Sequence, residues 1–435
     1  MSQSTIFARA SGGGRAGVAV FRISGPMARH ALVQLTGKSC RPRYAERVRV
    51  AAPDGAYIDD GLALLFPGPA SFTGDDVVEL QLHGSYAVEQ RLYAALQDLG
   101  CHLAEPGAFT LRAFANGKLD LTQAEGLAAL LEAETALQHR QAVDQLRGGL
   151  RQKAEAWRRE LTSAMAALDA AVDFPDEEDV DEVIAERAAP IVGDLSQSIS
   201  TILAGTVKAR RILDGVTLAL IGPPNAGKSS LFNRLVDEER AIVSETAGTT
   251  RDVVSATIDF FGHRLTLKDT AGIRSETPSA IEAEGIERAR AAGEGADLRL
   301  LCWPSGPLPM PTWMEDLARE GDIEVRTQAD RISMPSRAHV QVSIHDPSSV
   351  MSLQDVIRKR LDALASPGLA PTARQQDELQ AAERALEDFS VAAERAPEAG
   401  AEALRLAARA LERLTGRIAP DDVLDDIFSS FCIGK

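Results

Sequence analysis

A phosphate-binding loop is the part of the sequence whose residue types and spacing point most directly to chemistry. Residues 222–229, Gly-Pro-Pro-Asn-Ala-Gly-Lys-Ser, fit the pattern G-x-x-x-x-G-K-[ST] in full. Glycines at both ends let the main chain curl so that several N–H groups face one anion. Lys228 would reach the β- and γ-phosphates, and the Ser229 hydroxyl would ligate Mg²⁺. The predicted nucleotide contacts of this loop are Asn225, Ala226, Gly227, Lys228, Ser229 and Ser230.

The segments on either side of the loop would hold it in a binding conformation. Residues 216–221 form an apolar, β-favouring run that predicts a buried strand, and residues 229–235 predict the first turns of a helix. A helix that begins at the loop adds the partial positive charge of its N-terminus to the anion site. A chance glycine-rich turn is the alternative interpretation, and this order of strand, loop and helix disfavours it.

Two later motifs follow in the order typical of small GTPases. The strand-like run 265–268 ends in Asp269-Thr270-Ala271-Gly272, where the acid can hold Mg²⁺ through water and the closing glycine can meet the γ-phosphate. Before it lies Gly248-Thr249-Thr250-Arg251-Asp252, where a threonine can ligate Mg²⁺ from a loop ordered by the γ-phosphate. Each motif is common alone, but the set in this order indicates a GTPase. We assign the Mg²⁺ to Ser229 and Thr250.

The guanine-reading part of the domain departs from the expected pattern. An N-K-x-D motif should follow the strand-like run 323–326, but the sequence there is Thr327-Gln328-Ala329-Asp330. Asp330 would keep its two hydrogen bonds to the guanine edge, and Ser343 would lie in the base-side loop. Losing one or two neutral hydrogen bonds costs about 0.5–1.5 kcal/mol each, and about 1.4 kcal/mol is tenfold in affinity. We therefore expect GTP to be preferred over ATP, but bound roughly ten- to a hundred-fold more weakly than by an intact motif.

Length, charge and cysteine content limit the class of protein. The 435 residues suggest two to four domains, and an apolar fraction of 45% is enough for buried cores. With 63 acidic and 47 basic residues the net charge is −16, so any RNA contact must be local or supplied by a partner. The four cysteines form no CxxC pair, which argues against a disulfide framework and a zinc site. We see no signal peptide and no apolar stretch of membrane-spanning length, and we expect a cytoplasmic protein without membrane contact.

The rest of the sequence predicts a multidomain protein that combines α/β and all-α folds. Residues 1–118 contain strand-like runs and a helical segment, which indicate a small α/β domain. Residues 119–212 and 369–435 are rich in helix formers and predict one helical domain made of two separated stretches. The P-loop domain, residues 213–368, would be inserted between them. Within residues 1–118 we predict strands at 17–23, 62–66 and 77–82 and a helix at 28–35.

Three local patterns in the flanking domains are open to more than one interpretation. An apolar stripe predicts helix over residues 122–170, and Glu134 interrupts it. The acidic run 174–179 is most simply a solvated loop or a helix cap. Glu79 and Gln81 alternate with apolar neighbours, and spacing alone favours a solvated strand face. The stripe consists of Ala124, Leu127, Leu130, Leu131 and Leu137.

Further motifs make the sequence resemble one family over nearly its whole length. Residues 432–435 read Cys-Ile-Gly-Lys, a terminus specific to the tRNA-modification GTPase family known as MnmE or TrmE when it ends a chain with an inserted GTPase domain. The other shared motifs are Phe21-Arg22-Ile23-Ser24-Gly25, Phe72-Thr73-Gly74-Asp75-Asp76, Glu79-Leu80-Gln81-Leu82-His83-Gly84 and Asn116-Gly117-Lys118-Leu119-Asp120-Leu121.

The resemblance implies a second site and several partners. Residues 1–118 would dimerise and bind a tetrahydrofolate derivative, 5-formyl or methylene, through Arg22, Glu79 and Lys118. The homodimer would join an FAD-dependent MnmG-type protein in a heterotetramer. Together they would add a carboxymethylaminomethyl-type group to C5 of the wobble uridine of certain tRNAs. Composition alone does not distinguish a functional Cys432 from a cysteine that is only a small buried apolar residue. The resemblance favours a role of Cys432 in the modification step, and Lys435 is the last residue of the motif.

The resemblance also implies how GTP would be hydrolysed. The GTPase domains would meet across the dimer, and a potassium ion would replace an arginine finger. Glu282 matches the acid that orients the attacking water, although its region runs one residue longer here. The matching potassium ligands are Asn225, Ser244, Thr246 and Thr249. The implied nucleotide contacts in the loop before the DTAG motif are Ser244, Glu245, Thr246, Ala247, Gly248, Thr249 and Thr250.

Two other functions remain open at this point. One is a nucleotide-dependent scaffold that binds GTP but barely hydrolyses it, which the altered N-K-x-D motif favours. The other is a ribosome-assembly GTPase, since such proteins share the motif order. That function needs an RNA-binding domain, and the acidic sequence shows none.

Overall fold

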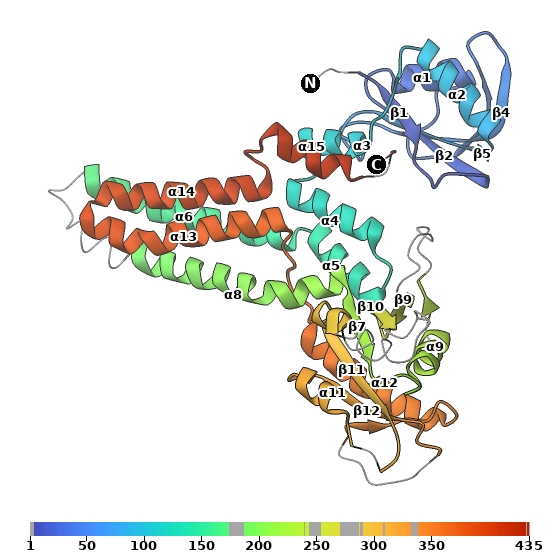
Figure 1. Cartoon of the computed structure of the whole chain (residues 1–435). Coiled ribbons are helices and arrows are strands. Elements are labelled where there is room, and N and C mark those ends of the chain that lie inside the picture. The colour runs from blue at the N-terminus through green and yellow to red at the C-terminus, as the bar shows by residue number, and fades with distance from the viewer. Residues whose placement is uncertain are drawn as a thin grey trace. The chain divides into compact units, whose positions relative to one another are not determined.

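A computed structural model of the chain contains two compact units, whose elements are labelled in Figure 1. The first unit comprises Met1–Ala128, Leu146–Gly193 and Asp377–Lys435, and the second comprises Ala129–Gln145 and Asp194–Gln376. The predicted boundaries at residues 118, 212 and 368 stay predictions. The structure describes residues 4–173, 187–238, 240–242, 254–269, 287, 290–307, 309–331, 338–431 and 433–434.

The N-terminal part of the first unit is a six-stranded sheet with the order β3-β4-β5-β2-β1-β6. Its strand pairs are antiparallel except for β1 with β6. The three predicted strands and the predicted helix are confirmed. The elements are β1 (Ile6–Arg9), β2 (Ala16–Ser24), α1 (Ala28–Thr36), β3 (Glu46–Ala51), β4 (Tyr57–Phe66), β5 (Val77–Gly84), α2 (Tyr86–Asp98) and β6 (His102–Leu103).

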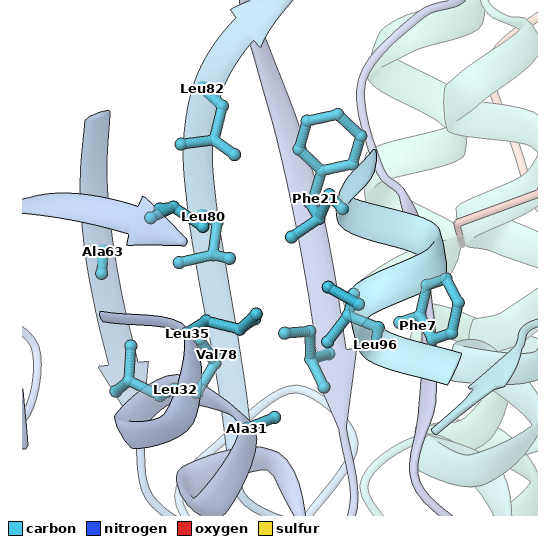
Figure 2. Packing of buried hydrophobic residues seen from close by; sticks show 14 of the residues in the cluster. Phe7, Phe21, Ala31, Leu32, Leu35, Ala63, Val78, Leu80, Leu82 and Leu96 are labelled. Atoms are coloured by element: carbon cyan, nitrogen blue, oxygen red, sulfur yellow. The ribbon is translucent and has the colours of Figure 1, made fainter. Parts of the chain in front are cut away.

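Strand alternation gives this sheet one apolar face and one partly polar face. On the apolar face, Phe21 of β2 and Leu80 of β5 are buried against helical residues such as Leu32 of α1 and Leu96 of α2 (Figure 2). Because successive side chains of a strand point to opposite sides, their neighbours Arg22 and Glu79 lie on the other face. The sheet therefore presents its charged residues away from the core.

The helices of the first unit come from distant parts of the sequence. Helix α6 packs along α14, and Arg405 of α14 pairs with Asp169 of α6 at 3.2 Å. Arg417, which follows α14, pairs with Glu155 of α6 at 2.7 Å. Two separated stretches therefore share one helical packing, as the sequence predicts. The helices are α3 (Ala108–Ala115), α4 (Leu121–Glu132), α6 (Gly149–Asp173), α13 (Ala373–Arg395), α14 (Pro397–Thr415) and α15 (Asp421–Ser429).

The predicted helical stretch 122–170 is confirmed, but two breaks divide it into α4, α5 and α6. Helix α4 ends at Glu132, and a separate helix, α5 (Ala136–Leu146), begins four residues later. Gln138 accepts hydrogen bonds from the N–H groups of Glu134 and Thr135, while the Thr135 hydroxyl accepts one from the N–H of Gln138. This is a capping box, which starts a new helix. Glu134 therefore lies between two helices rather than within an apolar stripe.

The second unit contains a seven-stranded sheet with the order β13-β12-β11-β7-β10-β9-β8. The five strands β13, β12, β11, β7 and β10 pair in parallel. Strand β9 pairs antiparallel with β10, and β8 pairs antiparallel with β9 at the edge of the sheet. The central strand β7 is buried on both faces, as its apolar run predicts. The strands are β7 (Val216–Ile221), β8 (Arg240–Ala241), β9 (Val254–Phe260), β10 (His263–Asp269), β11 (Leu298–Pro304), β12 (Ile323–Thr327) and β13 (Val340–Gln341). The helices are α8 (Ala189–Asp214), α9 (Lys228–Glu238), α11 (Thr312–Leu317) and α12 (Pro347–Leu364).

Candidate functional site

The phosphate-binding loop connects β7 to α9, as the sequence predicts. Two of its residues have left-handed backbone conformations, Asn225 with φ 61° and Gly227 with φ 81°. A Cβ atom at Gly222 would collide with the carbonyl oxygen of Cys302, so only glycine lets the end of β7 approach β11 this closely. These features give the main chain the tight curl that an anion cradle needs.

The Lys228 ammonium is held inside this curl. Lys228 is 4% exposed, and its Nζ donates to the carbonyl oxygens of Gly222 at 2.7 Å and Pro223 at 2.8 Å. Burial lowers the pKa of Lys228 below its usual value. A buried cation gains most from an opposite charge, so the loop is suited to the phosphates of a nucleotide.

Ser229 and Asp269 meet at the edge of the parallel sheet. The Ser229 Oγ donates to Asp269 Oδ2 at 2.6 Å, and Asp269 is 2% exposed at the end of β10. Strands β10 and β7 are parallel neighbours, so their carboxyl ends lie at one edge. A hydroxyl and a carboxylate are the hard oxygen ligands that Mg²⁺ prefers, and both fit the ion at this position. Ser230, the next predicted contact, is exposed on the first turn of α9.

Two residues of the altered base motif, Thr327 and Gln328, form hydrogen bonds with the phosphate loop. The Thr327 Oγ lies 2.5 Å from the carbonyl oxygen of Ala226 and 3.1 Å from that of Trp303. The Gln328 Nε2 donates to the carbonyl oxygen of Asn225 at 3.0 Å. Nothing in the sequence pattern identified these contacts, because the two residues stand where N-K-x-D has Asn and Lys.

Asp330 and Ser343, both predicted to lie on the base side, are brought together. The Ser343 hydroxyl donates to Asp330 Oδ1 at 2.8 Å and lowers the pKa of that carboxyl. Asp330 is exposed at the end of β12, where an ionised carboxylate is free to accept from a ligand. The phosphate half and the base half of the predicted site thus lie on the same edge of one sheet.

A second cluster of predicted residues lies on the polar face of the N-terminal sheet. Arg22 and Glu79 are cross-strand partners, and the Arg22 Nε and one terminal nitrogen both donate to Glu79 Oε1, at 3.1 and 2.9 Å. The guanidinium also lies 5.6 Å from the Phe72 ring centroid and 5.7 Å from that of Phe109. Neither aromatic contact was predicted, although Phe72 belongs to a shared motif.

Lys118 lies against the loop that follows β4, and that loop also carries Phe72. The Asn116 side chain donates to the carbonyl oxygen of Thr73 at 2.7 Å, which joins the two loops. A Cβ atom at Gly74 would be 3.3 Å from Lys118 Cε, so the exposed lysine lies against this loop. A guanidinium and a carboxylate beside aromatic rings, with an exposed lysine at the neighbouring loop, fit a flat, polar ring system that carries an acidic tail, as a folate does.

Comparison with known proteins places the chain in one family. Residues 5–118 match the family model of the GTP-binding protein TrmE N-terminus, and residues 121–432 match that of the MnmE helical domain. A relative from Caulobacter vibrioides, named tRNA modification GTPase MnmE, is 44% identical over 450 residues, which cover 99% of each chain. The chain belongs to the MnmE family. Relatives with the same name from Parvibaculum lavamentivorans and Phenylobacterium zucineum are 45% and 43% identical over at least 99% of each chain.

Gly434, in the terminal motif shared with the MnmE family, lies against the first strand of the N-terminal sheet. Phe431 is buried and stacks on Phe428 of α15 with ring centroids 6.0 Å apart. Gly434 has φ 94°, and a Cβ atom there would overlap the carbonyl oxygen of Arg9, the last residue of β1. Phe431 is therefore held among helical residues and Gly434 lies against β1, while Cys432 lies outside the described residues.

Several other predictions for an MnmE-family site also fall outside the described residues. They concern the loop before β9, the motif after β10 and the end of the chain. These residues are Ser244, Glu245, Thr246, Ala247, Gly248, Thr249, Thr250, Thr270, Ala271, Gly272, Glu282 and Lys435. Among the described residues, no helix is both long and apolar enough to cross a membrane.

Proposed function

We propose that the protein is a GTP hydrolase that acts in tRNA modification. The observation that carries the proposal is the pair of Ser229 and Asp269 beside the buried Lys228 ammonium. Such a set binds the phosphates and the Mg²⁺ of a nucleoside triphosphate. The full-length relatives are named tRNA modification GTPases, which supports the same reaction here.

Hydrolysis of GTP would depend on charge placement by this chain's own residues. Main-chain N–H groups of the loop and Lys228 offset the negative charge of the β- and γ-phosphates. Ser229, Asp269 and Thr250 would hold Mg²⁺, which would supply positive charge beside the phosphate oxygens. Glu282 orients the attacking water. Asp330 accepts from the guanine edge.

A potassium ion would supply the charge that an arginine finger supplies elsewhere. Asn225 stands at the loop position that matches a potassium ligand, and its left-handed backbone belongs to the loop's curl. Ser244, Thr246 and Thr249 would complete the ligand set, and the GTPase domains of a homodimer would close over it. An arginine finger contributes about 10³-fold or more, so we expect a comparable stimulation.

The modification itself would take place at the N-terminal site with a partner. Arg22, Glu79 and Lys118 would bind a tetrahydrofolate derivative as the one-carbon donor. An FAD-dependent MnmG-type protein would join the homodimer in a heterotetramer, and the wobble uridine of certain tRNAs would receive a carboxymethylaminomethyl-type group at C5. With a net charge of −16, tRNA contact would be local or supplied by the partner, in the cytoplasm.

Two measurements test the proposal. GTP turnover should be much faster in potassium than in sodium, and equal rates would reject the potassium site. Mass spectrometry of tRNA nucleosides from a deletion strain should show loss of the C5 group at the wobble uridine. An unchanged nucleoside profile would contradict the role in tRNA modification.

A scaffold that binds GTP but barely hydrolyses it is the second candidate. The observation in its favour is the replacement of Asn and Lys by Thr327 and Gln328 in the base motif. Turnover that stays negligible in potassium, with measurable GTP affinity, would favour the scaffold over the hydrolase.

A further inference from the structure

Thr327 and Gln328 contact two consecutive residues of the phosphate loop. Thr327 is 3% exposed, and its hydroxyl lies within hydrogen-bond distance of the carbonyl oxygen of Ala226. Gln328 adopts a left-handed backbone conformation, φ 55°, and its amide nitrogen donates to the carbonyl oxygen of Asn225. A non-glycine residue at such a φ is uncommon, and here the amide of that residue meets the loop.

These bonds set the direction of the loop's peptide groups. In a trans peptide the C=O and the following N–H point to opposite sides. With the carbonyl of Ala226 turned toward Thr327, the N–H of Gly227 points to the other side of the loop. The carbonyl of Asn225 is turned in the same way by Gln328, while the N–H of Ala226 meets the carbonyl oxygen of Pro223 at 3.3 Å.

We propose that Thr327 and Gln328 are positioning residues that hold the phosphate loop in its binding conformation from the base side. The inference rests on the proposed function, because it concerns the same nucleotide site. The altered motif then still holds the phosphate loop, although Asn and Lys are replaced. Discrimination between guanine and adenine then depends on Asp330, while Thr327 and Gln328 affect the binding of any nucleotide with phosphates.

The donors of Thr327 and Gln328 are used in contacts with main-chain carbonyls, which leaves recognition of the base to Asp330. A hydroxyl has one proton, so Thr327 can donate to Ala226 or to Trp303 but not to both at once. That proton is committed to a main-chain carbonyl rather than to the purine ring. Gln328 directs its amide nitrogen to Asn225. Asp330 is the acidic side chain of this segment that faces solvent beside Ser343.

Paired substitutions in the full-length protein test the inference. Thr327→Val removes the hydroxyl and keeps the shape, and Thr327→Ser keeps the hydroxyl. Gln328→Leu removes the donor, and Gln328→Lys keeps one. Titration calorimetry with GDP and ADP gives the affinities, and thermal melting without nucleotide reports folding.

We expect Thr327→Val and Gln328→Leu to weaken GDP binding by about five- to tenfold, since each loses one hydrogen bond. Thr327→Ser and Gln328→Lys should bind GDP as the natural protein does. The ratio of GDP to ADP affinity should stay constant in all four variants. Asp330→Ala, the matched control, should lower that ratio and leave the ADP affinity unchanged.

Two outcomes would overturn the inference. One is natural GDP affinity in both Thr327→Val and Gln328→Leu, and the other is loss of affinity that Thr327→Ser and Gln328→Lys fail to restore. If Thr327→Val does not fold, the comparison of Gln328→Leu with Gln328→Lys at this half-buried position tests the inference. A natural protein that binds GDP and ADP equally would refute the guanine assignment instead, and the Gln328 pair would still test the loop contact.

Discussion

Replacing Gly434 with alanine should release the end of the chain from the N-terminal sheet. Gly434 has φ 94°, and its Cα lies so close to β1 that an added Cβ would overlap the carbonyl oxygen of Arg9. The same Cβ would lie 2.8 Å from the Arg9 carbonyl carbon and 3.0 Å from Ala10 Cα. These neighbours are main chain and cannot rotate away, so the tail itself must move.

The size of the effect follows from two costs. A left-handed backbone conformation costs an L-residue about 1–2 kcal/mol, and the overlap with Arg9 adds to it. Because about 1.4 kcal/mol is tenfold in an equilibrium, the bound tail of Gly434→Ala should be at least about tenfold less favoured. Ile433→Ala is the matched control, since Ile433 is 56% exposed and its truncation removes little packing.

Hydrogen exchange of the C-terminal peptide measures this release directly. Gly434→Ala should exchange faster than the natural protein, and Ile433→Ala should not. GTP turnover should be unchanged, because the phosphate loop belongs to the other unit. We also expect tRNA modification in cells to fall. Natural protection of the peptide in Gly434→Ala would refute the steric reasoning.

Three further predictions follow from other sites. Thr327→Asn with Gln328→Lys should tighten GTP by about tenfold and leave ATP unchanged, since an Asn amide has a second proton that would reach the guanine carbonyl, which adenine lacks, while Lys keeps the donor to the loop; no gain in calorimetry would contradict this. Hydrogen bonds from Arg29 lower the pKa of Asp76, so its stabilisation is present above the unfolded pKa of about 4 and lost as pH falls through the lower folded value. Asp76→Asn should therefore lower Tm at pH 7 and flatten its fall in acid, and an unchanged acid limb in melting curves would reject the assignment. Cys432→Ser should keep GTP turnover and lose tRNA modification, and normal modification in cells would end that idea.

Much of the fold could be predicted because it depends on local patterns. The apolar run of β7 specifies a doubly buried strand, and the loop after it specifies a phosphate cradle. The meeting of Ser229 and Asp269 also follows, because parallel strands bring their carboxyl ends to one edge. Such contacts are set by topology, and topology is readable from motif order.

Contacts between distant segments could not be predicted in the same way. Glu134 reads as a flaw in a helical stripe, yet its carboxylate accepts from Arg264 Nε at 2.7 Å, which is 130 positions away. No local pattern identifies that partner. The break at this point did have a local signal, since Thr135 and Gln138 have the spacing of a capping box. The strong helix formers on both sides favoured helix across this position, so the break was not predicted.

In the base motif, the replacement of Asn and Lys suggests a larger loss of nucleotide affinity than the contacts of the new residues indicate. Counting residue identities leaves one of three guanine-loop residues, which favours a weak binder or an inactive scaffold. What the loop requires is a donor aimed at each of two carbonyls, and Thr327 and Gln328 supply one each. The remaining difference from an amide is one proton at Thr327, worth about 0.5–1.5 kcal/mol. A loss of that size is closer to tenfold than to a hundredfold in affinity, so the altered motif no longer argues against turnover.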